Sequence, residues 1–129
     1  MLAWATPPAL TVTDAWVRVT PGAEVAAAYL TLHNGGPQPV NIVGVSSPLA
    51  AVAMIHETRL VGTQSTMRAR EELVVAAGAT LRFAPGGLHV MLQGLSQALK
   101  PGDTVPLLLL LDGGRTLAVT ARVRPLTSE

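Results

Sequence analysis

The chain has 129 residues, 49% of them hydrophobic, which suffices for one domain with a core of ordinary size. Its nine basic and eight acidic residues are spread along the chain and leave a formal net charge of +1, so no basic stripe is present for nucleic acid or anionic lipid. Cysteine is absent, which excludes disulfides and thiolate metal sites. Apolar runs such as residues 107–111 are far shorter than the ~20 residues of a membrane-spanning helix, so we expect a soluble protein.

Short β-rich segments separated by turn signals predict an all-β sandwich or barrel. We expect strands at 10–19, 25–33, 40–46, 52–61, 66–70, 79–83, 88–93, 104–112 and 115–123. Glycine, proline and asparagine typical of hairpin turns lie at 21–22, 34–37, 62, 78, 85–87, 101–103 and 112–114. One helical turn fits within 95–100, and the alanines of 50–54 favour a helical start.

The segment 88–93 predicts a strand with chemistry on one face. Side chains alternate along a strand, so the aliphatic residues at 88, 90 and 92 share the core face. His89, Met91 and Gln93 then point the other way, with His89 and Met91 about 7 Å apart along the strand. Two donor atoms can converge from there.

The segment 56–67 predicts a hairpin whose turn lies near Gly62. A loop of two or four residues centred on Gly62 and Thr63 places Met67 opposite Thr58, so that Met67 and His56 share a face as diagonal neighbours. A loop of odd length would break this arrangement. If the hairpin borders the strand of His89 and Met91, two imidazoles and two thioethers meet.

Imidazole and thioether donors without carboxylate or thiolate favour a soft ion of low charge, and among biological metals this indicates Cu(I). Zinc fits less well, because its protein sites use cysteine, histidine and carboxylates. Thioethers also remain ligands in an oxidising compartment, where free thiols would pair.

Each of these residues also has a structural interpretation. A lone methionine is more often a filler of apolar gaps than a ligand, and a lone histidine is more often a satisfied surface residue. The joint pattern, which involves two of three histidines and two of four methionines, is what favours a metal site. For Met54, core packing is the preferred interpretation and a fifth donor the alternative. We expect Met1 to be the initiator and His33 to be structural.

Common catalytic motifs are absent from this sequence. It has no GxSxG elbow, no phosphate-binding glycine loop, and no second histidine four residues after His56 to complete an HExxH motif. A catalytic triad could be composed from Ser65, His56 and Asp103, but most chains offer such a combination. We therefore expect that the protein is not an enzyme.

At this point the residues resemble a known family, the PCu(A)C copper chaperones of the bacterial periplasm. Its hallmark is a histidine, ten residues, a methionine, twenty-one residues and then His-x-Met, and His56, Met67, His89 and Met91 reproduce these intervals. Flanking text is also similar: AAAYLTLHN at 26–34, HETR at 56–59, PGGLHVML at 85–92 and LKPGDTVPLLLLL at 99–111.

The resemblance implies a cupredoxin-like Greek-key β-sandwich or barrel at residues 10–124, with tails at 1–9 and 125–129. It implies one Cu(I) ion on the four motif residues. It also implies delivery to the CuA domain of cytochrome c oxidase subunit II, directly or with a Sco-type protein, by a periplasmic monomer in its mature form. Glu57 and Gln93 stand where some members carry further methionines, and ARVRPLTSE lacks the Met- and His-rich tail of others.

Three functions stay open at this point: copper delivery, copper scavenging or resistance, and a metal-free interaction module. A copper scavenging or resistance protein would use the same donors as a delivery chaperone. A metal-free β-sandwich could act as an adhesion or assembly module. A blue-copper electron carrier needs a cysteine thiolate, so the absence of cysteine excludes it. The N-terminus lacks the features of an intact signal peptide, so from the residues alone either the cytosol or a mature exported form is open.

Overall fold

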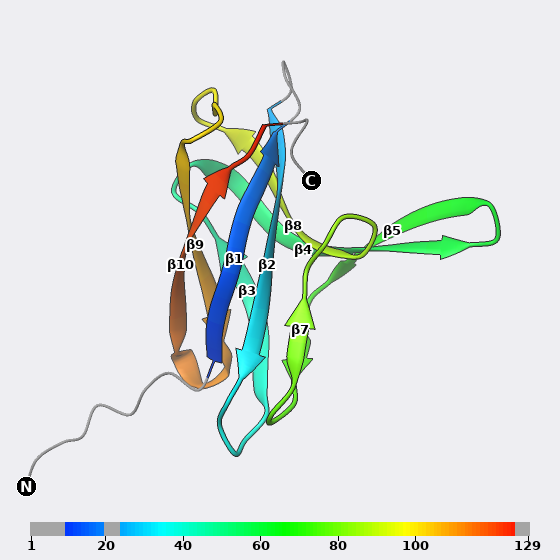
Figure 1. The fold of residues 1–129 in the computed structure, drawn as a ribbon, viewed down its shortest axis with the longest axis vertical. Coiled ribbons are helices and arrows are strands. Elements are labelled where there is room, and N and C mark those ends of the chain that lie inside the picture. The colour runs from blue at the N-terminus through cyan, green and yellow to red at the C-terminus, as the bar shows by residue number, and fades with distance from the viewer. Residues whose placement is uncertain (1–9, 20–23, 126–129) are drawn as a thin grey trace, which may run out of the picture.

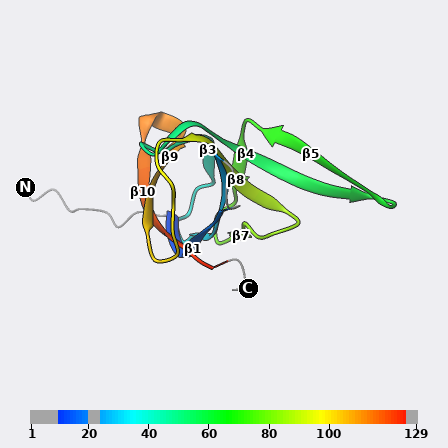
Figure 2. The ribbon, with the colours of Figure 1, turned by 90° about the horizontal axis from the view of Figure 1, so that it is seen from above.

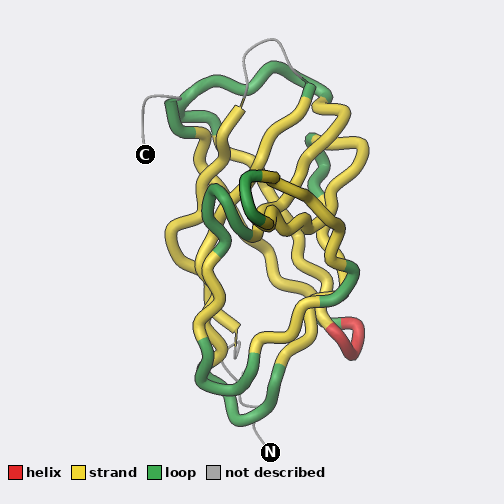
Figure 3. The backbone as a smooth tube through the Cα atoms, turned by 90° about the vertical axis from the view of Figure 1, so that its right-hand side faces the viewer, coloured by secondary structure: helices red, strands yellow, loops and turns green. Residues whose placement is uncertain are grey.

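The computed structural model describes residues 10–19 and 24–125, which are almost entirely β-structure (Figure 3). The strands are β1 (Leu10–Val19), β2 (Val25–Asn34), β3 (Val40–Ser46), β4 (Ala50–Val61), β5 (Gln64–Arg70), β6 (Leu73–Val75), β7 (Thr80–Arg82), β8 (Leu88–Leu95), β9 (Thr104–Leu111) and β10 (Thr116–Val123). The expected tail at 1–9, the turn at 21–22 and residues 126–129 of the expected C-terminal tail lie outside the described residues.

The all-β prediction is confirmed, and each expected strand is present with ends that shift by at most a few residues. The short strand β6 was not predicted. The expected helical start at 50–54 is wrong, because these residues pair with β8 and this pairing overrides the helix preference of alanine. The expected helical turn at 95–100 is also wrong, and the helical segment that the described chain does contain is the 3-10 turn Asp112–Gly114, at an expected hairpin turn.

The strands form one curled sheet with the order β5-β4-β8-β2-β1-β10-β9-β3-β6, and β7 pairs with a further stretch of β2 (Figure 1). All neighbouring pairs are antiparallel except β1 with β10. Seen from above, the sheet wraps around an interior, with β9 and β3 across from β1 and β2 (Figure 2). No helix in the described part of the chain is long and apolar enough to span a membrane.

The interior of the curled sheet is filled by aliphatic side chains from its opposing strands. The β8 residues Leu88, Val90 and Leu92 are buried in it, as the alternation of this strand predicts. Leu30 from β2 and Leu109 from β9 belong to the same cluster. Because β8 is held by this face, its other face carries His89 and Met91 outside the core.

The hairpin of β4 and β5 extends beyond the rest of the sheet as an arm (Figure 1). β4 pairs with β8 only as far as Glu57, whereas its pairing with β5 runs from Ile55 to Val61. The outer half of the arm therefore consists of two strands only. Such a ribbon has little apolar burial of its own.

We expect substitution of Gly94, near the end of β8, to destabilise the sheet at its contact with Ala51 of β4. Gly94 has φ +66°, and a Cβ there would lie 2.8 Å from Ala51 Cβ. Gly94→Ala should therefore cost about 2–4 kcal/mol in urea unfolding, from backbone strain plus overpacking. Gly78 has φ +75° with no atom within 4 Å of a Cβ, so Gly78→Ala is the control and should cost about 1 kcal/mol. Equal losses would show that the close approach is not rigid.

Candidate metal centre

The outer face of β4, β8 and β2 carries the chemistry that the sequence indicated. The register places His56 directly opposite His89, and Met54 directly opposite Met91. Directly opposite residues on one sheet face have Cβ atoms about 4.5–5.5 Å apart. The expectation that the hairpin borders the strand of His89 and Met91 is confirmed.

The two imidazoles are close to each other and approach edge to face. Their ring centroids lie 5.8 Å apart at an angle of 71°. His89 is only 4% exposed, so although it points away from the core as expected, its face is not open to solvent. Tyr29 of β2 covers it on the side away from His56, with a centroid distance of 6.4 Å.

A backbone carbonyl fixes the tautomer of His89. The Gly87 carbonyl lies 3.2 Å from His89 Nδ1. Because a carbonyl only accepts hydrogen bonds, Nδ1 must carry a proton, and in the neutral ring Nε2 then keeps its lone pair for a metal. The same carbonyl accepts the amide of Thr58 at 3.0 Å, so one oxygen ties the base of the arm to the His89 ring.

His56 has a ring nitrogen without a partner. Its Nδ1 is buried, and no hydrogen-bond partner for it is present among the described residues. Removal from water lowers the pKa of His56, and the neighbouring His89 lowers it further by charge repulsion. A neutral imidazole is the form that binds metal, so both effects favour a ligand at neutral pH.

Met67 is brought to His56 by the hairpin turn. Val61 pairs with Gln64, so the loop has the two residues Gly62 and Thr63, and Met67 is opposite Thr58. The predicted shared face of Met67 and His56 is thereby confirmed. Met67 is 53% exposed, since the arm has no third strand to cover it.

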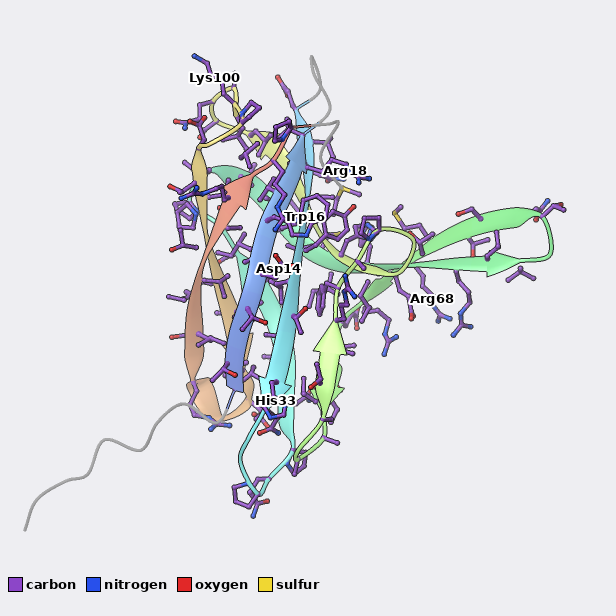
Figure 4. The ribbon with its side chains drawn as sticks, in the orientation of Figure 1. Asp14, Trp16, Arg18, His33, Arg68 and Lys100 are labelled. Atoms are coloured by element: carbon purple, nitrogen blue, oxygen red, sulfur yellow. The ribbon has the colours of Figure 1, made fainter. Side chains whose placement is uncertain are left out.

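The two faces of the arm differ sharply in charge. The face of His56 also carries Thr58 and Leu60 from β4, and Ser65, Met67 and Ala69 from β5, none of which is charged. The opposite face carries Arg59, Arg68 (Figure 4) and the ion pair of Glu57 with Arg70 at 2.8 Å. An incoming cation therefore meets an uncharged, sulfur-bearing face.

The sulfur atoms of β4 and β8 lie at the inner end of this face. Met91 is partly buried, while Met54 is 38% exposed. The interpretation of Met54 as a core residue is therefore wrong, because β5 ends at Arg70 and leaves this stretch of β4 without a neighbour on that side. Met54 instead shares the face of both histidines.

An aromatic row continues from His89 across the sheet, and sequence reasoning missed it. Trp16 of β1 is opposite Tyr29, with ring centroids 4.6 Å apart. A bulge in β1 between Thr13 and Trp16 shifts the register by one residue and so places Trp16 on this face. The Arg18 guanidinium lies 5.9 Å from the Tyr29 ring centroid (Figure 4 labels Trp16 and Arg18). Burial raises the pKa of Tyr29, and Arg18 partly offsets this.

The remaining candidates lie elsewhere. His33 is at the far end of β2, where its Nδ1 is 2.9 Å from Thr80 Oγ1, which agrees with a structural role (Figure 4). Within residues 10–19 and 24–125, no three histidine, aspartate or glutamate side chains group as metal ligands. The candidate donors are thus two imidazoles with thioethers, a set that suits a soft monovalent ion such as Cu(I) better than zinc.

We expect His56 to titrate below its ordinary pKa of about 6.5 in the metal-free protein. Replacing His89 by Phe removes the repelling charge, so the midpoint should rise in His89→Phe while staying below about 6.5, because burial is the larger cause. The midpoint is measured from the His56 ring-proton NMR shift. A His56 midpoint at or above about 6.5 in the parent protein would contradict the burial of this ring.

Comparisons with known proteins identify the family and the fold of this chain. A family model described as "LpqE-like: Putative lipoprotein LpqE-like" matches residues 10–123. "Putative lipoprotein Lxx21020" of Leifsonia xyli subsp. xyli is 34% identical over 114 residues, which cover 88% of this chain and 68% of that protein. The solution structure of apo-DR1885 from Deinococcus radiodurans is 38% identical, covering 98% of this chain and 86% of that one, with a TM-score of 0.71.

More distant structures share the fold. The copper-bound PCuAC domain of PmoF2 is 20% identical, with a TM-score of 0.74, and covers 96% of this chain and 98% of that one. The expected cupredoxin-like β fold is thereby confirmed. With a family model that spans residues 10–123, the chain belongs to the LpqE-like family, which is the family of the PCuAC domains.

Proposed function

We propose that this protein is a copper chaperone that binds one Cu(I) ion through His56, Met67, His89 and Met91. The observation that carries the proposal is the His56–His89 pair, in which His56 Nδ1 is buried without a partner and His89 Nε2 is left free by the Gly87 hydrogen bond. Both rings share a face with thioethers and with no carboxylate. Zinc and other harder ions would find two imidazoles there but no carboxylate or thiolate to complete the set.

Relatives support copper as the cargo. One of them, whose structure is described as CuI-DR1885, is 36% identical to this chain. The copper-bound PCuAC domain of PmoF2 shows that this fold can hold copper. An oxidising compartment outside the cytoplasm fits the thioether donors, the lack of cysteine and the lipoprotein names of the family and its relative.

Graded exposure of the donors supports release to a partner. His89 is buried and anchors the ion, whereas Met67 lies half-exposed on the uncharged face of the arm. An acceptor can displace the outer thioether first, without unfolding the sheet. We propose as acceptor the CuA domain of cytochrome c oxidase subunit II, reached directly or with a Sco-type protein. Scavenging without delivery would use the same donors, so the choice between them requires a transfer experiment.

Removal of one inner donor should weaken Cu(I) binding strongly. Met91→Leu keeps the volume and apolar character of the side chain but loses the sulfur, so the fold should be retained. We expect its Cu(I) affinity to fall at least about tenfold in competition with a Cu(I) chelator, which is about 1.4 kcal/mol. His33→Gln, at the far end of β2, is the control and should bind as the parent does. Equal affinities of Met91→Leu and the parent would remove Met91 from the site.

Delivery is tested by mixing the copper-loaded protein with a metal-free CuA domain under reducing conditions. We expect copper to appear in the CuA domain faster than from the same concentration of Cu(I) held by a small chelator of equal affinity. Transfer no faster than from the chelator would favour scavenging over delivery. A parent protein that binds no Cu(I) at all would instead favour the metal-free module.

A further inference from the structure

We propose that Met54 is a fifth copper-binding residue, an exchange ligand that holds the ion together with His56, His89 and Met91 when Met67 is released. This inference rests on the proposed function and extends it to a residue outside the four-residue motif. With Met54, three thioethers are available to the ion, whereas the four-residue motif provides two.

Position is the first argument. Met54 is directly opposite Met91, and it precedes His56 by two residues, so it shares the face of all four proposed ligands. With Cβ atoms of opposite residues about 4.5–5.5 Å apart, two flexible thioethers can reach one ion between them. His56 therefore has a methionine on either flank: Met54 along its own strand and Met67 across the hairpin.

The neighbours of Met91 are the second argument. On the side away from Met54, Met91 is opposite Ala27, which has no donor atom, and Ala27 is in turn opposite Arg18 of β1. A cation that leaves Met91 in that direction meets a guanidinium. In the direction of Met54 it meets a second sulfur, and the pocket beyond Met54 is lined by both a cation, Arg70, and a carboxylate, Glu71. Along this row, a further donor atom for the ion is therefore present on the Met54 side of Met91 and not at Ala27.

Access is the third argument. Met54 is 38% exposed and lines a pocket with Val43, Val45, Ala69 and Arg70, because β5 ends before it can cover this part of β4. Packing in the core therefore does not explain a methionine at this position. An exposed thioether beside the buried half of the site can move on and off the ion without disturbing the core.

The two exposed methionines lie at different ends of the same face. Met67 is on the arm, where an acceptor would engage, and Met54 is at the root of β4. When a donor from the acceptor replaces Met67, Met54 binds the ion together with the two histidines and Met91. Replacement of one sulfur by another conserves the number of donors, so no oxidation or proton release is involved.

The test is a double-mutant cycle with Met54→Leu and Met67→Leu, in which Cu(I) affinity is measured by chelator competition. Each sulfur substitutes for the other, so each single variant should lose less than about tenfold and the double variant at least about a hundredfold. Val52→Leu is the matched control, because Val52 lies on the same face and is likewise exposed. Combined with Met67→Leu, it should add nothing.

A second readout follows the sulfur directly. With methionines labelled in the methyl carbon, Cu(I) should shift the Met54 methyl NMR signal, and the shift should grow in Met67→Leu. An unmoved Met54 signal, or a double variant no weaker than Met67→Leu, would overturn the proposal while the parent still binds copper. Failure of the proposed function gives a different result, because the parent protein would then bind no Cu(I). The role of Met54 would be excluded by that result as well.

Discussion

The register of β4 against β8 is the constraint on which the candidate site depends. β8 cannot slip, because Leu88, Val90 and Leu92 are buried in the core and a shift of one residue would exchange them for His89 and Met91. β4 is then aligned to β8 by a ladder that keeps one register from Ala50 to Glu57, which sets His56 opposite His89. The Gly87 carbonyl completes the arrangement by holding both the His89 ring and the Thr58 amide.

Rigidity decreases outward from this ladder, and the donors are distributed along that gradient. His89 is enclosed by Tyr29 and His56, whereas Met67 is on a two-stranded arm that gains little from the core. A tight storage site would bury all of its ligands. A site that must both hold and release an ion is better served by buried nitrogen donors and exposed sulfur donors that exchange one at a time.

The aromatic row beside the site has a structural explanation. Trp16 and Tyr29 are buried on the outer face, where Arg18 and Arg124 lie over the Trp16 ring with guanidinium carbons 5.5 and 4.8 Å from its centroid. Cation–π contacts of this kind stabilise aromatic rings that no second layer covers. The row keeps water from one side of His89, and it places positive charge at the end of the site away from Met54.

Local pattern alone determined much of this molecule. Turn residues and alternating side chains predicted the strands, the core face of β8 and the shared face of His56 and Met67, because these depend on chain geometry within a hairpin or a strand. The same pattern proposed the four donors on the condition that the hairpin borders β8, and the resemblance to a known family then implied the same ligand set. Only the tertiary structure decided which strands become neighbours, because pairing between β4 and β8, or across the β1 bulge, depends on the packing of the whole sheet. That is why Tyr29 and Trp16 were missed, why Met54 was assigned to the core, and why the burial of His89 was not foreseen.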